Sequence, residues 1–172
     1  MPTPATSQLQ VQLNRLRDTG FADKLNQHAL AHSFPTPFFF AIASRETNCR
    51  NILGDKQNGV FHGVGIVQID IQHPIAKIAR DTGSWQTNPD PLIEFGAQIL
   101  AGNIQQAQQK FPSLSAEQQL KIAASGYNCG MGNAIKGQQQ SGDSDARTTG
   151  HDYGRDVLNR MAVFADLIAG GN

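Results

Sequence analysis

The feature that most constrains the fold is an apolar segment that ends in an acid. Residues 37–46 read Pro-Phe-Phe-Phe-Ala-Ile-Ala-Ser-Arg-Glu. Large apolar side chains on every face of a helix leave no polar stripe for solvent, so such a helix is buried. Thr36 followed by Pro37 is typical of an N-cap and first helical turn. The segment therefore predicts a helix that starts at Thr36, lies at the centre of the core and carries Glu46 near its C-terminal end.

Glu46 has two interpretations. A carboxyl group held against hydrocarbon loses hydration, which disfavours its charged form and raises its pKa. A glutamic acid of this kind is still protonated near neutral pH and can act as a general acid. Most glutamates, however, lie at the surface. Glu46 could equally end a buried helix and face solvent, or pair with Arg45 or Arg50.

The composition limits the classes of function. The 172 residues fit one domain and are enough to bury a core. The chain has 14 basic and 14 acidic residues, which argues against nucleic-acid binding and against adhesion to anionic membranes. The longest apolar run, residues 38–43, is far too short for a membrane span, and residues 1–6 do not begin a signal peptide. We therefore expect a protein made in the cytoplasm that acts on a neutral or mixed-charge substrate.

Periodic apolar positions elsewhere predict a mostly α fold. Further helices are expected to begin near Ser7, Phe21, Pro74, Asp90, Ser115 and His151. Residues 64–71 have strand-like composition and predict a small β element. Residues 49–65 are expected to be loop, and residues 137–147 a polar surface loop.

Two aspartates follow Glu46 in the chain. A protonated glutamic acid that faces one or two ionised aspartates is the minimum equipment for cleaving a glycosidic bond, because one group protonates the leaving oxygen and another activates water. Asp55 and Asp70 are the candidates. Each also has a structural interpretation: Asp55 lies among turn-forming residues, and Asp70 could cap the helix near Pro74.

Four segments, taken in order, resemble the goose-type lysozymes. They are Ser-Arg-Glu-Thr at 44–47, Gly-Val-Gly-Ile-Val-Gln-Ile-Asp at 63–70, Ser-Gly-Tyr-Asn-Cys-Gly at 125–130 and Thr-Thr-Gly-His-Asp-Tyr at 148–153. Soluble lytic transglycosylases share the Glu, Gly-x-x-Gln and Gly-Tyr-Asn elements. The resemblance implies an α+β lysozyme-like fold, a single helical domain with a small β element beside the active-site cleft. Residues 1–35 would be N-terminal helices packed on a catalytic domain of residues 36–172.

The resemblance also implies roles for individual residues. Glu46 would be the general acid of an inverting hydrolysis, and Asp70, with Asp55, would position the attacking water. Asp55 is the weaker match, because an ungapped alignment places Gly59 at the family's second acidic position. Gln68, Tyr127, Asn128 and Tyr153 would contact the sugar, with Tyr127 and Asn128 also holding Glu46; ordinary packing is the alternative for Tyr127.

The cysteines depart from the family pattern. Cys49 lies one turn past Glu46, and Cys129 directly follows the Tyr-Asn pair that the fold would place beside Glu46. If their β-carbons are close, a disulfide between them would form after export to an oxidising compartment. Two cysteines alone do not make a zinc site, and His62 and His151 lack regular ligand spacing. We expect no metal and no cofactor.

The sequence therefore predicts a muramidase that cleaves the β-1,4 bond between N-acetylmuramic acid and N-acetylglucosamine in peptidoglycan. One alternative is a lytic transglycosylase, which forms an anhydro ring without admitting water. Another is a non-catalytic glycan-binding module on the same scaffold. We expect a monomer that acts on the cell wall after delivery by a secretion machine, by phage lysis or on a carrier. A dedicated inhibitor protein is an expected partner in the first case.

Overall fold

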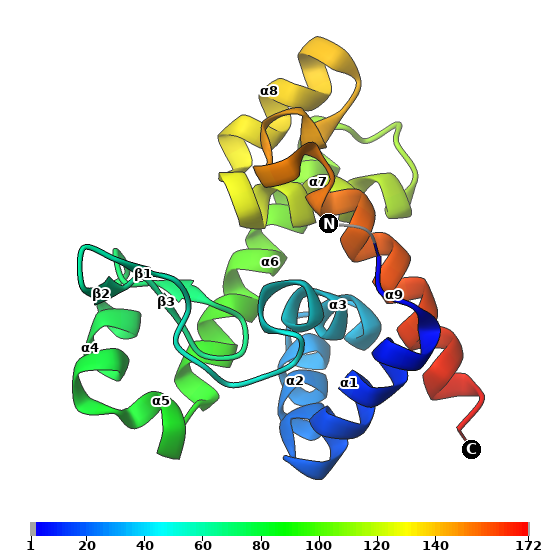
Figure 1. Ribbon diagram of the computed structural model, residues 1–172. Helices are drawn as coiled ribbons and strands as arrows, with labels where there is room; N and C mark the ends of the chain where they lie inside the picture. Colours follow the sequence, from blue (N-terminus) through cyan, green and yellow to red (C-terminus); the bar gives the residue numbers. More distant parts are fainter. Residues whose placement is uncertain (1–2, 172) are drawn as a thin grey trace.

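The apolar helix predicted from residues 37–46 is at the centre of the molecule. The computed structural model describes residues 3–171, and in it α3 (Thr36–Thr47) is seen end-on in the middle of the fold (Figure 1). Its Phe38, Phe39 and Ile42 are fully buried. Helices α1, α2 and α9 pack against it. Burial on every face explains why this helix has no polar stripe.

The fold is mostly α, as the sequence predicts, with a small β element. The other helices are α1 (Thr6–Asp18), α2 (Phe21–Ala31), α4 (Pro74–Thr82), α5 (Ser84–Thr87), α6 (Asp90–Lys110), α7 (Ala116–Cys129), α8 (Met131–Ser141) and α9 (Tyr153–Ala169). Two short 3-10 helices, η1 (Ser144–Arg147) and η2 (Thr149–His151), precede α9. The strands pair as two antiparallel hairpins: β1 (Lys56–Gln57) with β2 (Val60–Phe61), and β3 (Gly63–Val64) with β4 (Ile69–Asp70).

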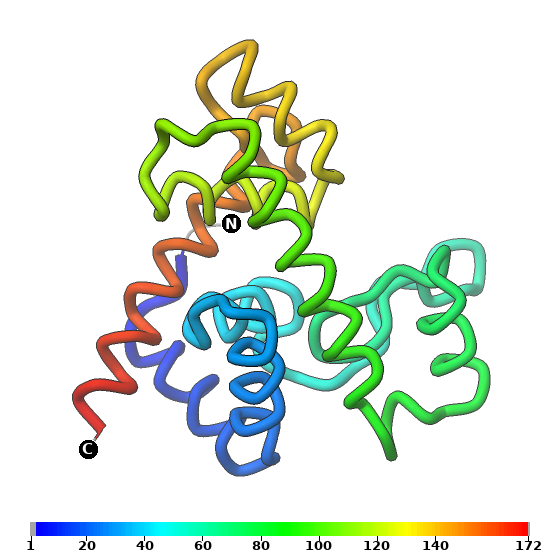
Figure 2. The backbone as a smooth tube through the Cα atoms, turned by 180° about the vertical axis from the view of Figure 1, so that it is seen from behind, coloured from blue at the N-terminus to red at the C-terminus, as the bar shows by residue number. Residues whose placement is uncertain are grey.

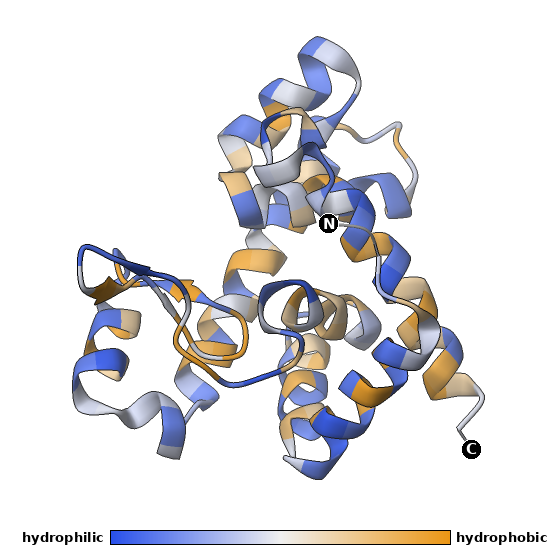
Figure 3. Ribbon diagram, in the orientation of Figure 1, coloured by the Kyte–Doolittle hydropathy of each residue, from blue (hydrophilic) through white to orange (hydrophobic). Residues whose placement is uncertain are grey.

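Two groups of elements and the long helix α6 lie around the central helix. The hairpins lie to one side with α4 and α5, and α7, α8 and η1 form an upper part (Figure 1). The long helix α6 runs diagonally between them, as the view from behind shows (Figure 2). The upper part is more hydrophilic along α8, whereas apolar residues line the inner faces of α3 and α9 (Figure 3). No helix within residues 3–171 is long and apolar enough to span a bilayer.

The N-terminal helices share the core of the central helix. Leu9, Leu13 and Leu16 of α1 and Leu25 of α2 are buried in the same cluster as the phenylalanines of α3. One continuous apolar core therefore includes residues on both sides of position 35. The division into N-terminal helices and a catalytic domain at that position stays a sequence-based prediction.

Local helix signals predict several boundaries well. Ser115 and Gln118 form the expected capping box: the Ser115 hydroxyl accepts from the Gln118 backbone N–H (3.2 Å), and the Gln118 side chain accepts from the Ser115 N–H (2.9 Å). The start of α3 differs by one residue, since Pro35 is its N-cap and Thr36 is already helical.

The expected surface loop at residues 137–147 is wrong. Helix α8 continues to Ser141, and Ser144 and Asp145 are fully buried. The Asp145 carboxylate accepts hydrogen bonds from the Gly154 and Arg155 backbone N–H groups (2.7 and 2.9 Å) at the start of α9. An anion is stabilised at a helix N-terminus, so this polar segment is buried because its charge has partners there. Residues 63–70 form the expected small β element, the hairpin of β3 and β4. Residues 56–61, which were expected to be loop, form the hairpin of β1 and β2.

Candidate active site

The centre of the candidate site is a hydrogen bond between Glu46 and Tyr153. Glu46 lies in the last turn of α3, and Tyr153 is the first residue of α9. The Tyr153 hydroxyl donates a short hydrogen bond to Glu46 Oε1. Tyr153 is only 3% exposed, so the partner of the Glu46 carboxyl group in this hydrogen bond is shielded from solvent. The predicted contact of Tyr153 with the sugar stays a prediction.

Burial raises the pKa of Glu46, as the apolar sequence around it predicts. The hydrogen bond from Tyr153 and the charge of Arg45 lower that pKa by less. Burial and the nearby Glu46 charge raise the pKa of Tyr153 well above its usual value. The Tyr153 hydroxyl therefore keeps its proton and is the donor in its hydrogen bond with Glu46.

Directly behind this pair is a group of buried charges, the ionic cluster, that sequence reasoning missed. Arg45 pairs with Asp152 (2.8 Å) and Asp156 (2.7 Å), and Arg160 also pairs with Asp156 (2.8 Å). The Arg45 guanidinium lies 5.4 Å from the centre of the Tyr153 ring. The cluster ties the end of α3 to the first turns of α9. The only sequence signal was the i, i+4 spacing of Asp156 and Arg160.

The turn between β3 and β4 is fixed beside Glu46. Tyr127 donates its hydroxyl hydrogen to the Val67 carbonyl (2.7 Å), and Thr47 donates to the Ile66 carbonyl (2.9 Å). A β-carbon at Gly96 would lie 2.9 Å from Val67 Cγ2 and 3.3 Å from the Tyr127 hydroxyl, so the helix α6 needs glycine there. Tyr127 therefore supports the hairpin. Burial, and next the Glu46 charge, raise the pKa of the Tyr127 hydroxyl well above its usual value.

Gln68 holds the same hairpin from inside. Its amide nitrogen donates to the Ile52 and Gly65 carbonyl groups (3.1 and 2.7 Å). A β-carbon at Gly54 or Gly63 would overlap its amide oxygen, so the side chain fills a space that only glycines leave. The structure thus gives Gln68 a supporting contact, and its predicted contact with substrate stays a prediction.

The two candidate aspartates lie on the hairpin segment and are exposed. Asp70, in β4, accepts a hydrogen bond from the Gln72 backbone N–H (2.7 Å), and the N-cap of α4 is His73. Asp55 lies immediately before β1. Among the described residues, neither carboxylate contacts Glu46. Asn128 is also exposed, and its side-chain oxygen accepts from the Thr149 N–H (2.9 Å).

The expected disulfide is not formed in the structure, because the two cysteines have different neighbours. The Cys49 sulfur is buried and lies 3.8 Å from the Gln12 side chain of α1. Cys129 is partly exposed at the end of α7 and contacts the carbonyl of Gly130. Burial raises the pKa of the Cys49 thiol to about 12. Both are free thiols, and Cys49 is packed as a small apolar residue.

The described residues contain no group of three or more His, Cys, Asp or Glu side chains able to hold a metal ion. Trp85 lies in the short helix α5 and packs on the core.

The chain resembles known proteins over most of its length. Residues 13–166 match the family model described as Lysozyme g. A Lysozyme g of Epinephelus coioides is 30% identical over 150 residues, which cover 84% of this chain and 74% of that protein. The Lysozyme g of Casuarius casuarius is 34% identical over 123 residues and that of Struthio camelus 35% over 127, each covering 72% of this chain. The chain spans 60% and 55% of these two bird proteins.

Proposed function

This chain belongs to the lysozyme g family of glycoside hydrolases, and we propose that it hydrolyses the bond between N-acetylmuramic acid and N-acetylglucosamine in peptidoglycan with Glu46 as the general acid. The observation that carries the proposal is the half-buried Glu46, whose pKa is raised by loss of hydration and whose carboxyl group is held by Tyr153. A carboxyl group with a raised pKa can protonate the leaving oxygen near neutral pH.

Asp70, with Asp55, positions the attacking water in this proposal. The turn that precedes Asp70 is attached beside Glu46 through Tyr127 and Thr47. Val67 and Asp70 are three residues apart, so the Asp70 Cα lies within about 11 Å of the attached Val67. A carboxylate there can hold water on the face of the sugar opposite the acid. An acid on one face of the sugar and a water-holding carboxylate on the other are what hydrolysis with inversion requires.

Analysis of the products tests this proposal. Purified peptidoglycan is digested with the protein, and the soluble muropeptides are examined by mass spectrometry. Hydrolysis gives reducing muramic acid ends, and NMR of the fresh products gives the inverted anomer. Anhydro-muropeptides as the main product would assign the protein as a lytic transglycosylase instead. Binding to peptidoglycan without release of muropeptides would assign it as a glycan-binding module.

The remaining expectations rest on the sequence alone. They are action on the cell wall outside the cytoplasm, a monomeric state and a dedicated inhibitor protein. Size-exclusion chromatography with light scattering tests the monomer. Co-expression with the neighbouring open reading frames of the producing organism, followed by an activity assay, tests the inhibitor.

A further inference from the structure

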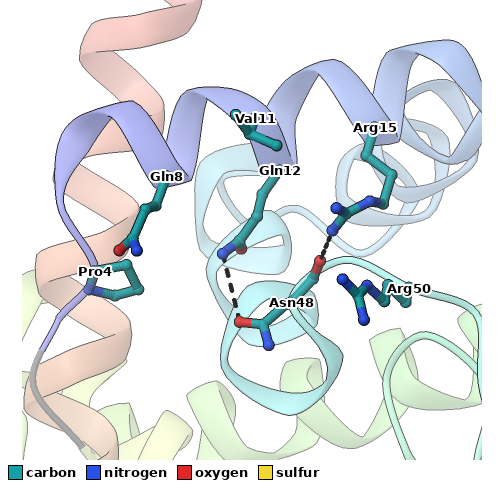
Figure 4. Close-up of a pocket in the computed structure, with 7 residues that line it drawn as sticks. All are labelled: Pro4, Gln8, Val11, Gln12, Arg15, Asn48 and Arg50. Carbon is teal, nitrogen blue, oxygen red and sulfur yellow. Dashed lines mark hydrogen bonds between the residues drawn. The ribbon is translucent and has the colours of Figure 1, made fainter.

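A cavity of about 320 Å³ lies between α1 and the residues that follow α3 (Figure 4). It is separate from the pair formed by Glu46 and Tyr153, and the proposed mechanism does not use it. Its lining comes from the start of the chain, from α1 and from the end of α3: Pro4, Gln8, Val11, Gln12, Arg15, Asn48 and Arg50.

The cavity carries positive charge without a matching acid. Arg15 and Arg50 both line it, and no aspartate or glutamate does. Arg15 donates to the Asn48 carbonyl (2.5 Å), and Gln12 donates to the Asn48 side chain (3.4 Å), which fixes one wall. Among the described residues, no hydrogen bond or ion pair engages the Arg50 guanidinium, which lies beside Asn48 in Figure 4. Two guanidinium groups that line one cavity favour an anion in it.

The lining also indicates which anion. Guanidinium groups match the planar fork of a carboxylate and bind it through paired hydrogen bonds. The side-chain amides of Gln8 and Gln12 add donors and acceptors of the kind that a peptide backbone needs. Pro4 and the 57% exposed Val11 supply an apolar wall. These features suit the carboxylate of a short peptide.

The cavity lies close to the proposed acid along the chain. Asn48 follows Glu46 by two residues and Arg50 by four. Four residues span at most about 14 Å, so the two Cα atoms are no farther apart than that. A peptide of four residues has the same reach when extended. Peptidoglycan carries such peptides on muramic acid, and they contain free carboxylates.

We propose that this cavity is a subsite for a carboxylate of the peptide on the muramic acid next to the bond that is cleaved. The proposal rests on the proposed muramidase function and adds a recognition site outside the glycan cleft. Arg50 provides the contact that is free to engage the peptide, and Arg15 holds the wall of the site at Asn48.

The test compares Arg50→Gln with the wild-type protein on two substrates. One is intact peptidoglycan, and the other is glycan strands from which an amidase has removed the peptides. We expect kcat/KM on intact peptidoglycan to fall about three- to tenfold through KM, as for loss of a charge-assisted contact, with no change on the stripped strands. Arg17→Gln is the matched control, because Arg17 lies on α1, is exposed and does not line the cavity.

Three results would contradict the proposal that this cavity is a peptide subsite. One is an Arg50→Gln variant that is unchanged on both substrates, and another is one that is weakened equally on both. The third is equal affinity of the wild type for inorganic phosphate and for a free muramyl tetrapeptide, which would indicate a general anion site. A wild-type protein inactive on both substrates would instead overturn the muramidase function on which the subsite depends.

Discussion

The two sides of the candidate active site are built differently. At the junction of α3 and α9, Glu46 is held by the buried Tyr153 and backed by the ionic cluster. On the hairpin side, strands of two residues carry the exposed Asp70, whose side chain is held by one backbone N–H. Glu46 is thus fixed by contacts between two helices that are far apart in the sequence but packed together in the fold. The position of Asp70, the proposed water-positioning group, depends on local backbone geometry instead. Changes on the first side should alter stability and pKa, and changes on the second mainly turnover.

The largest effect is expected at Glu46. Glu46→Gln keeps the shape of the side chain but removes the proton that the leaving oxygen needs, so release of muropeptides should be abolished. The matched control is Glu117→Gln, the same change at an exposed residue. Near-normal release by Glu46→Gln would assign the acid to another residue.

The same variant tests the burial of Glu46 through its stability. Because the pKa of Glu46 is raised in the folded protein, the stability that its protonated form provides is present at low pH and is lost as the pH rises through the raised pKa. Glutamine does not ionise. Glu46→Gln should therefore melt at a higher temperature than the wild type above that pKa and at a similar temperature below pH 4. Equal melting temperatures at every pH would contradict the raised pKa.

Breaking the ionic cluster should give the next largest effect, in stability. Asp156→Asn leaves Arg45 and Arg160 without their shared buried carboxylate, and loss of one partner of a buried pair costs about 3 to 5 kcal/mol. Urea unfolding measures this difference. Asp81→Asn breaks the more exposed pair with Arg80 and should cost less than about 1 kcal/mol. Similar losses of unfolding free energy in Asp156→Asn and Asp81→Asn would show that the ionic cluster stabilises the fold no more than an exposed pair does.

The hairpin side should respond in turnover alone. Asp70→Asn is expected to lower kcat about 100-fold, the size of a general-base contribution, and Asp55→Asn less. Both should change the free energy of unfolding by less than about 0.5 kcal/mol, because both side chains are exposed. The double variant shows whether they share the water, since independent contributions multiply. A double variant as active as the wild type would exclude both residues from the reaction.

The smallest effect is expected at Tyr153. Tyr153→Phe removes a hydrogen bond that stabilises the carboxylate formed when Glu46 gives up its proton, so kcat/KM should fall about tenfold. That hydrogen bond lowers the pKa of Glu46, and its loss should move the alkaline limb of the pH–rate profile to higher pH. Tyr127→Phe is the control, because the Tyr127 hydroxyl donates to the Val67 carbonyl and not to Glu46. The alkaline limb of the pH–rate profile of this variant should stay in place. An unshifted limb in Tyr153→Phe would contradict the role of the hydrogen bond.

The sequence by itself determined the helical class, the central helix and the place of Glu46 near its end. These follow from local rules: apolar residues on all faces predict a buried helix, and capping residues such as Ser115, before α7, mark where other helices begin. The burial that raises the pKa of Glu46 was one of the two interpretations that the sequence left open. The ordered motifs pointed to the family because each is a short local pattern.

Only the tertiary structure decided the partners. Tyr153 lies 107 residues after Glu46, and Arg45 finds Asp156 across 111 residues. Asp145 looked like part of an exposed polar loop until the start of α9 provided its donors. Cys49 and Cys129 lie next to two motifs of the family and were expected to pair, yet Cys49 packs against Gln12 of α1. The partner of each buried charge or thiol depends on how whole helices pack against one another. A local pattern of residues does not predict that packing.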